Sequence, residues 1–169
     1  MKVALLLTGN ELMTGDTVDS NSSRIAQSLA LQGFDVAHKV TVGDDLALIV
    51  RELKNLTHRY EIVIVNGGLG PTVDDLTAEA LSILSGQALV ENNQALTHVN
   101  AWCEARGIAA NAANLKQSLL PATAAVLDNP IGSAVGIQLV FNQSLLLCTP
   151  GVPSELAAML DGSVSEALK

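Results

Sequence analysis

Two short, continuously apolar runs limit what this chain can fold into. They occupy residues 3–7 and 62–65, and neither shows the alternation of a half-exposed strand. Such runs are typical of strands buried on both faces of a parallel sheet. Between them, apolar residues recur at helical spacing at 25–30 and 46–56, and an alternating stretch at 34–42 indicates a strand nearer the sheet edge. This order predicts an α/β fold, with a parallel sheet covered by helices on both faces.

The second half of the chain has a different pattern. We expect helices at residues 76–84, 92–105 and 111–120, strands at 125–127, 134–141 and 144–148, and a final helix from Ser154. A tight turn at Asn142-Gln143 joins the last two strands, which predicts a C-terminal antiparallel hairpin added to the parallel sheet. Hydrophobic residues make up 49% of the chain and aromatic residues only 2%, so Leu, Ala, Val and Ile must form the core. The length suits a single domain, residues 1–169.

The charge of the chain argues against some partners. Its formal net charge is -8 and it has no cluster of Lys and Arg, so we expect no nucleic-acid surface. The run at residues 3–7 is too short for a signal peptide or a membrane span, and Cys103 and Cys148 form no CxxC pair. We therefore expect a cytoplasmic protein that does not bind membranes. A nucleotide pocket stays open, because backbone amides or a bridging metal can hold phosphate locally.

The stretch NGGLGPTVDDLT follows the third expected strand. In open parallel sheets, ligands collect at this edge, beyond the carboxyl ends of the strands. Gly67, Gly68 and Gly70 let a ligand approach the main chain, and the helix that follows offers free N–H groups to a phosphate. Asp74 and Asp75 would repel that phosphate unless a divalent cation took oxygen ligands from both. The stretch therefore predicts a metal and phosphate site.

A structural explanation competes with this one. Thr72-x-x-Asp75 fits a capping box, and acids in the first turn favour the helix dipole with or without a ligand. Capping does not explain three glycines in four residues, which cost backbone entropy and contribute nothing to a cap. The sequence therefore favours the functional interpretation and leaves capping open.

Other polar loops belong at the same sheet edge. Their candidate site residues are Gly9, Glu11, Asn21, Ser22, Asp44 and Gly151. Taken singly, the loop after the first strand is explained as a solvated loop with a helix cap. Asp44 or Asp45 can cap the helix expected at 46–56, and capping is the simplest explanation of Asp44. The stretches PGVP and GSAVG are, by themselves, no more than turns.

Taken together, four motifs resemble a known family. TGNELMTGDTVDSN, VGDD, GGLGPTVDDLT and PGVPSEL are similar to the N-terminal domain of the CinA family of competence/damage-inducible proteins, within the wider MoaB/Mog molybdopterin-binding fold. The resemblance covers nearly the whole chain and implies a three-layer α/β/α domain with a mostly parallel sheet. Asn10, Val135 and Thr149 depart from the acid, proline and leucine that are usual in the family.

The resemblance also implies an activity. CinA-type domains resemble metal-dependent pyrophosphatases that hydrolyse ADP-ribose to AMP and ribose 5-phosphate, with a divalent ion such as Mg²⁺, Co²⁺ or Ni²⁺ and with K⁺ as an activator. In the Mog-like relatives two acids are important to activity, and the motifs place them at Asp44 and Asp75. We therefore expect a nucleotide-type substrate, and we also expect a homo-oligomer.

The expected mechanism gives each candidate a role. Asp75, with Asp44 or Asp74, holds the metal against the pyrophosphate, and Glu11 is a weaker candidate for the catalytic base. The expected substrate contacts are Gly9, Asn21, Ser22, Gly67, Gly68, Gly70, Thr72 and Gly151.

A rival hypothesis keeps the pocket but not the chemistry. It makes the chain a molybdopterin-binding or non-catalytic nucleotide-binding domain, and fold analogy alone cannot choose between the two. CinA proteins often continue into a middle segment and a C-terminal nicotinamide-nucleotide amidase domain. Nothing in this sequence resembles that amidase, so we expect the chain to be truncated from a longer one.

Overall fold

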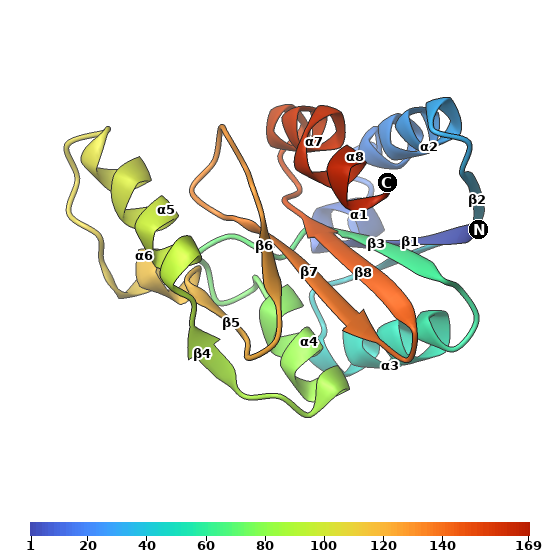
Figure 1. The fold of residues 1–169 in the computed structure, drawn as a ribbon, viewed down its shortest axis with the longest axis horizontal. Helices are drawn as coiled ribbons and strands as arrows, with labels where there is room; N and C mark the ends of the chain where they lie inside the picture. Colours follow the sequence, from blue (N-terminus) through green and yellow to red (C-terminus); the bar gives the residue numbers. More distant parts are fainter.

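A six-stranded mixed sheet lies between two layers of helices in the computed structural model, which describes all residues from Met1 to Lys169 (Figure 1). The strands are β1 (Lys2–Thr8), β2 (Asp35–Val42), β3 (Ile62–Asn66), β4 (Leu89–Glu91), β5 (Leu119–Pro121), β6 (Ala125–Leu127), β7 (Gly136–Phe141) and β8 (Ser144–Thr149). The helices are α1 (Asn10–Thr14), α2 (Asn21–Leu31), α3 (Leu46–Thr57), α4 (Thr77–Ser85), α5 (Asn93–Glu104), α6 (Ala112–Lys116), α7 (Pro153–Asp161) and α8 (Ser163–Ala167).

The strand order in the main sheet is β2-β1-β3-β8-β7-β6. The first four strands are parallel, and β7 runs antiparallel to both β8 and β6. This confirms the predicted parallel sheet with an added hairpin, and it places β2 at the edge as expected. Asn142 and Gln143 both have positive φ, 51° and 63°, as a two-residue hairpin turn that matches the twist of the strands requires.

Both faces of the sheet are buried, which explains the continuous apolar runs. In β1, Val3, Leu5 and Leu7 pack with α2, α7 and α8, whereas Ala4 and Leu6 pack with α3 and α4. Successive side chains of a strand point to opposite faces, so a strand with helices on both sides needs apolar residues throughout. The predicted three-layer α/β/α architecture is confirmed.

Part of the second half of the chain differs from the prediction. The helix expected at 111–120 covers only Ala112–Lys116, because the chain then turns into β5, which pairs antiparallel with β4. A capping box between Asn111 and Asn114 begins this short helix. The sequence analysis missed the small β4–β5 sheet and also helix α1, and it began β7 two residues too early.

Helices α5 and α6 lie with β4 and β5 beyond the β6 edge, away from β1 and β2 (Figure 1). None of the helices combines the length and the hydropathy needed to cross a bilayer.

The strand order reverses between β1 and β3. From β1 the chain crosses to β2 on one side, and it then returns to β3 on the other side. Loops that leave the carboxyl ends of two such strands diverge and leave a crevice between them, where ligands of open α/β sheets bind.

Candidate functional site

A cavity of about 660 Å³ occupies this crevice. Its wall is formed by the loops after β1, β2, β3 and β8 and by residues 133–134. Ten predicted site residues lie on this wall: Gly9, Glu11, Asp44, Gly67, Gly68, Gly70, Thr72, Asp74, Asp75 and Gly151. The sequence therefore correctly predicted that residues from these four loops lie close together.

Two glycines of the loop after β3 are required by the chain's own conformation. Gly67 and Gly68 have φ of 113° and 71°, and a Cβ at residue 68 would overlap the hydroxyl of Thr77. A Cβ at Gly70 would meet the carboxylate of Asp75, which can move. Gly67 and Gly68 therefore have structural causes, and the number of glycines alone does not indicate a ligand.

Thr72 and Asp75 interact, but they do not begin a helix. Oδ2 of Asp75 accepts hydrogen bonds from the backbone N–H and the hydroxyl of Thr72, both at 2.8 Å. Helix α4 begins only at Thr77, whose N–H donates to the carbonyl of Gly68 at 3.1 Å. The predicted capping box is therefore a turn before the helix, and the first amide of α4 is not free for a phosphate.

Lys116 of α6 holds the carbonyls of this turn. Its ammonium group donates to the carbonyls of Thr72 and, at 2.8 Å, of Asp75. The sequence analysis missed Lys116 because it lies 41 positions after Asp75 in the chain.

Asp44 is not the cap of α3. Asp45 takes that role, since its Oδ1 accepts from the N–H of Leu48 at 2.9 Å. Asp44 instead pairs with Asn10: its Oδ2 accepts from the N–H of Asn10 at 3.2 Å, and its own N–H donates to Oδ1 of Asn10 at 2.9 Å. The capping explanation for Asp44 is wrong, and its carboxylate lies on the cavity wall.

The environment of Asp44 opposes its charge. Burial raises its pKa above the usual 3.8, and the negative charges of Glu11, Asp74 and Asp75 raise it further, while the hydrogen bond from Asn10 acts in the opposite direction. Three carboxylates are therefore close enough to Asp44 to oppose its ionisation. A carboxyl perturbed in this way by burial and by like charges is a candidate functional group.

This raised pKa predicts a pH-dependent gain in stability for Asp44→Asn. A carboxyl whose folded-state pKa exceeds 3.8 destabilises the fold once it ionises, so the penalty appears as the pH rises through the folded pKa and is absent below 3.8. We expect urea denaturation to show the variant to be more stable than the parent at pH 7 and equal to it near pH 3.8. Asp45→Asn, at the cap, should show no such gain. Equal stability of Asp44→Asn and the parent at both pH values would contradict the account of this site.

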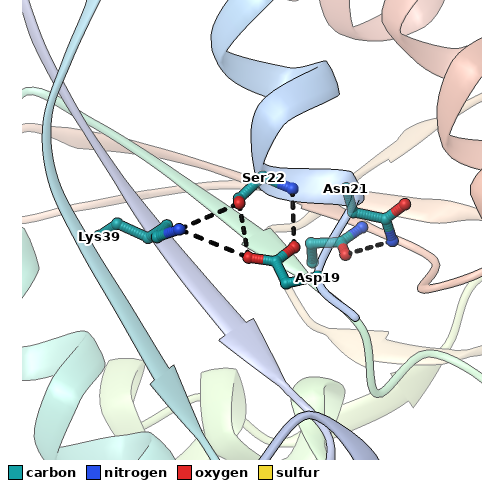
Figure 2. Close-up of polar contacts among 5 residues, drawn as sticks. Asp19, Asn21, Ser22 and Lys39 are labelled. Atoms are coloured by element: carbon teal, nitrogen blue, oxygen red, sulfur yellow. Dashed lines mark hydrogen bonds and ion pairs between the residues drawn. The ribbon is translucent and has the colours of Figure 1, made fainter. Parts of the chain in front are cut away.

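Ser22 lies outside the cavity. Its hydroxyl donates to Oδ2 of Asp19 at 2.5 Å and accepts from the ammonium of Lys39 at 3.2 Å, and Asp19 forms an ion pair with Lys39 at 3.5 Å (Figure 2). Burial of Asp19 opposes its ionisation, but the hydrogen bonds from Ser22 and the charge of Lys39 outweigh it, and the pKa of Asp19 is lowered. Ser22 and Asp19 thus fix the start of α2.

Asn21 lies outside the main cavity and, together with Asn66, holds the loop after β8 that lines it. Its amide nitrogen donates to Oδ1 of Asn66 at 2.9 Å and to the carbonyl of Gly151 at 2.8 Å. The amide nitrogen of Asn66 donates in turn to the carbonyl of Pro150 at 2.7 Å and to Oγ1 of Thr149 at 3.1 Å. Asn66 is only 3% exposed and joins the ends of β3 and β8 to α2. The sequence could have indicated this role of Asn66, because an amide at the end of a buried apolar strand needs hydrogen-bond partners.

Asn21 lines a second, smaller cavity of about 100 Å³, which shares Thr8, Glu11, Gly151 and Pro153 with the main one. Four polar residues that line the main cavity were not among the predicted site residues: Thr8, Gln117, Ser133 and Glu155. The stretch GSAVG, interpreted as a turn, supplies Ser133, and the motif PGVPSEL supplies Glu155.

The charge on the main cavity wall is entirely negative. It includes the carboxylates of Glu11, Asp44, Asp74, Asp75 and Glu155 and no Lys, Arg or His. No three His, Cys, Asp or Glu side chains are close enough together to surround a metal ion by themselves. The wall can therefore offer a cation one or two carboxylates but not a complete cage.

Comparison with known proteins identifies the relatives of this chain. A family model described as a probable molybdopterin binding domain matches residues 4–169. CinA-like proteins from Colwellia psychrerythraea and Geobacter metallireducens are 53% and 46% identical over 99% and 97% of this chain. The chain spans about two-fifths of the length of these relatives, 39% and 40%.

Solved structures agree with the sequence relatives. The protein CinA from Thermoplasma acidophilum, described as of unknown function, has a TM-score of 0.89 and 30% identity, covering 98% of this chain and 96% of its own. The molybdopterin biosynthesis enzyme MoaB from Thermus thermophilus has a TM-score of 0.68 at 22% identity, covering 99% of this chain and 91% of its own. At that identity MoaB shows the fold alone.

Proposed function

This chain belongs to the family of probable molybdopterin binding domains, among its CinA-like members. We therefore propose that its acidic cavity binds a small phosphorylated ligand of the pterin or nucleotide class together with a divalent cation. One observation carries the proposal. Five carboxylates share a cavity at the reversal of strand order, and no basic side chain lies on its wall to neutralise them.

The donor set fits a Mg²⁺-like ion that is shared with a ligand. Such ions are usually bound by one or two carboxylates and by substrate phosphates, and not by a cage made of protein alone. Asp75 would hold the ion with Asp44 or Asp74. Both hydrogen bonds from Thr72 use Oδ2 of Asp75, so its Oδ1 takes none of them. When bound, the cation would screen phosphate from carboxylate and would draw electrons from a phosphoryl oxygen.

Within this cavity we further propose the hydrolysis of a pyrophosphate, with ADP-ribose as the substrate. A water oxygen would form a bond to phosphorus, the bond from phosphorus to the bridging oxygen would break, and AMP and ribose 5-phosphate would leave. The proton lost by the water would pass to a carboxylate, with Glu11 as the candidate.

The alternative is a domain that binds molybdopterin or a nucleotide without reaction. The family description supports this alternative directly, since it names binding and not hydrolysis. The two proposals share the cavity and the cation, and they differ only in whether a product forms.

Titration calorimetry with ADP-ribose tests the shared proposal. We expect heat of binding in the presence of Mg²⁺ and none in excess EDTA. The bound mixture is then analysed for AMP with Mg²⁺, Co²⁺ or Ni²⁺, with and without K⁺, and the mass in solution checks the proposed homo-oligomer. Equal amounts of AMP and ribose 5-phosphate support hydrolysis, whereas metal-dependent binding without AMP supports the alternative. Absence of binding to ADP-ribose and to molybdopterin with every metal would contradict the proposal.

A further inference from the structure

Glu155 occupies a distinct part of the acidic cavity. It lies in the first turn of α7, and it is not among the carboxylates whose charge raises the pKa of Asp44. Its carboxylate rests against Gly132, where a Cβ would overlap both carboxylate oxygens. No Lys, Arg or His side chain forms an ion pair with Glu155. The charge is therefore held in a fixed place without a cationic partner.

A buried amide fixes this carboxylate. Asn129 is fully buried, and its amide nitrogen donates to Oε2 of Glu155 at 2.9 Å and to the carbonyl of Ala134 at 2.7 Å. Its Oδ1 accepts from the N–H groups of Ile131 and Gly132 at 3.2 Å and 3.1 Å. A backbone carbonyl can only accept, so the contact with Ala134 sets the orientation of the amide. Asn129 thus holds the loop at residues 131–134 and the Glu155 carboxylate in fixed positions relative to each other.

Gln117 lies on the same cavity wall and holds a buried acceptor that has no partner. It is only 7% exposed, and its Nε2 donates to the carbonyl of Leu69 at 3.4 Å and to Oγ of Ser133 at 3.1 Å. The Leu69 carbonyl cannot donate, so the nitrogen must face it, and Oε1 of Gln117 has no partner in the protein. A buried acceptor without a donor is unfavourable. This side of the cavity therefore brings together the Glu155 carboxylate, the Gln117 amide and the Ser133 hydroxyl.

We infer that Glu155, supported by Gln117, accepts hydrogen bonds from two adjacent donors of the ligand. A carboxylate presents two oxygens side by side, which matches a vicinal diol or the neighbouring amino and ring N–H groups of a pterin-like ring. Ribose and pterin rings share this chemistry. The inference rests on the proposed function and specifies the orientation of the ligand in the cavity. The phosphates lie toward Asp75, and the ring that carries the donors lies at Glu155.

Calorimetry with Mg²⁺ and four nucleotides separates the two sources. ADP and 2′-deoxy-ADP differ by one ribose hydroxyl, and GDP and IDP differ by the amino group that guanine shares with pterins. We expect the parent chain to prefer the donor-bearing member of at least one pair by about 10- to 100-fold, the range of a hydrogen bond to a charged group. Glu155→Gln should abolish that preference, although it keeps an oxygen for Asn129.

Gly132→Ala provides a second variant, because its Cβ must displace the Glu155 carboxylate without removing the charge. We expect the same loss of preference. Glu79→Gln is the matched control, since Glu79 also lies in the first turn of a helix but does not line the cavity. Binding without any preference in the parent, or with a preference that survives in both site variants, overturns this inference alone. Failure of all four nucleotides to bind also overturns the inference, whereas the proposed function is overturned only if ADP-ribose and molybdopterin fail to bind as well.

Discussion

Asp75→Asn is expected to lower the rate of ADP-ribose hydrolysis by about 100-fold or more while the fold is kept. The asparagine oxygen can still accept from the N–H and hydroxyl of Thr72, and the carbonyl of residue 75 still accepts from Lys116. The variant therefore removes charge and little else. Without that charge, a divalent ion loses one of its few anionic ligands. The measurement is AMP release at saturating Mg²⁺, with circular dichroism to check the fold.

Asp74→Asn separates the contributions of the two adjacent acids, of which Asp74 is the weaker candidate for the metal. Asp74 is the neighbouring residue, it is exposed, and its side chain makes no hydrogen bond within the protein. We expect a loss of less than about 10-fold, because an exposed carboxylate is well solvated and contributes less to a site. Full activity in Asp75→Asn would remove Asp75 from the mechanism.

Asn66→Ala is expected to lower the free energy of unfolding by about 1–3 kcal/mol, the cost of leaving buried polar groups without partners. The substitution removes the donor to the carbonyl of Pro150 and the acceptor for Asn21. Because these contacts hold Pro150 and Gly151, which line the main cavity, the affinity for a phosphorylated ligand should fall as well. Urea denaturation gives the first quantity and titration calorimetry gives the second.

Asn55→Ala serves as the comparison for Asn66→Ala. Asn55 is exposed on α3, and its side chain makes no hydrogen bond within the protein, so we expect a change within about 0.5 kcal/mol. A similar small effect for Asn66→Ala would mean that the loops after β3 and β8 are held by other contacts.

The elements that the sequence predicts well are those with a strong local period. Strands β1 and β3 are apolar throughout because helices cover both faces, and the stripe of Ile49, Leu53 and Leu56 in α3 follows helical spacing. The small sheet was missed because β4 and β5 have three residues each, too few to show any period. Its pairing of Val90 with Leu120 is a long-range contact, which no local pattern specifies.

The location of the candidate site could be predicted from the sequence, but the contacts of its individual side chains could not. Parallel topology alone brings Gly9, Asp44 and Gly67 to one edge. Which of two adjacent acids caps α3 depends on Asn10, a contact 34 residues away, and both acids suit the cap by type. Glu155 looks like an ordinary first-turn acid until the buried Asn129 is seen behind it.

The site also links function to stability. The pKa of Asp44 is raised by burial and by its acidic neighbours, so the folded protein is less stable than it would be with a neutral side chain there. Such a loss of stability is expected where several like charges line a ligand-binding site. A bound cation would reduce it.

Crystals grown with Co²⁺ and a non-hydrolysable analogue of ADP-ribose test the central proposal most directly, because the anomalous signal of cobalt locates the ion without ambiguity. We predict an anomalous peak between the pyrophosphate and the carboxylate of Asp75, with Asp44 or Asp74 as a further ligand. A pyrophosphate bound elsewhere on the protein, or bound in this cavity with no ion between it and Asp75, would contradict the proposal.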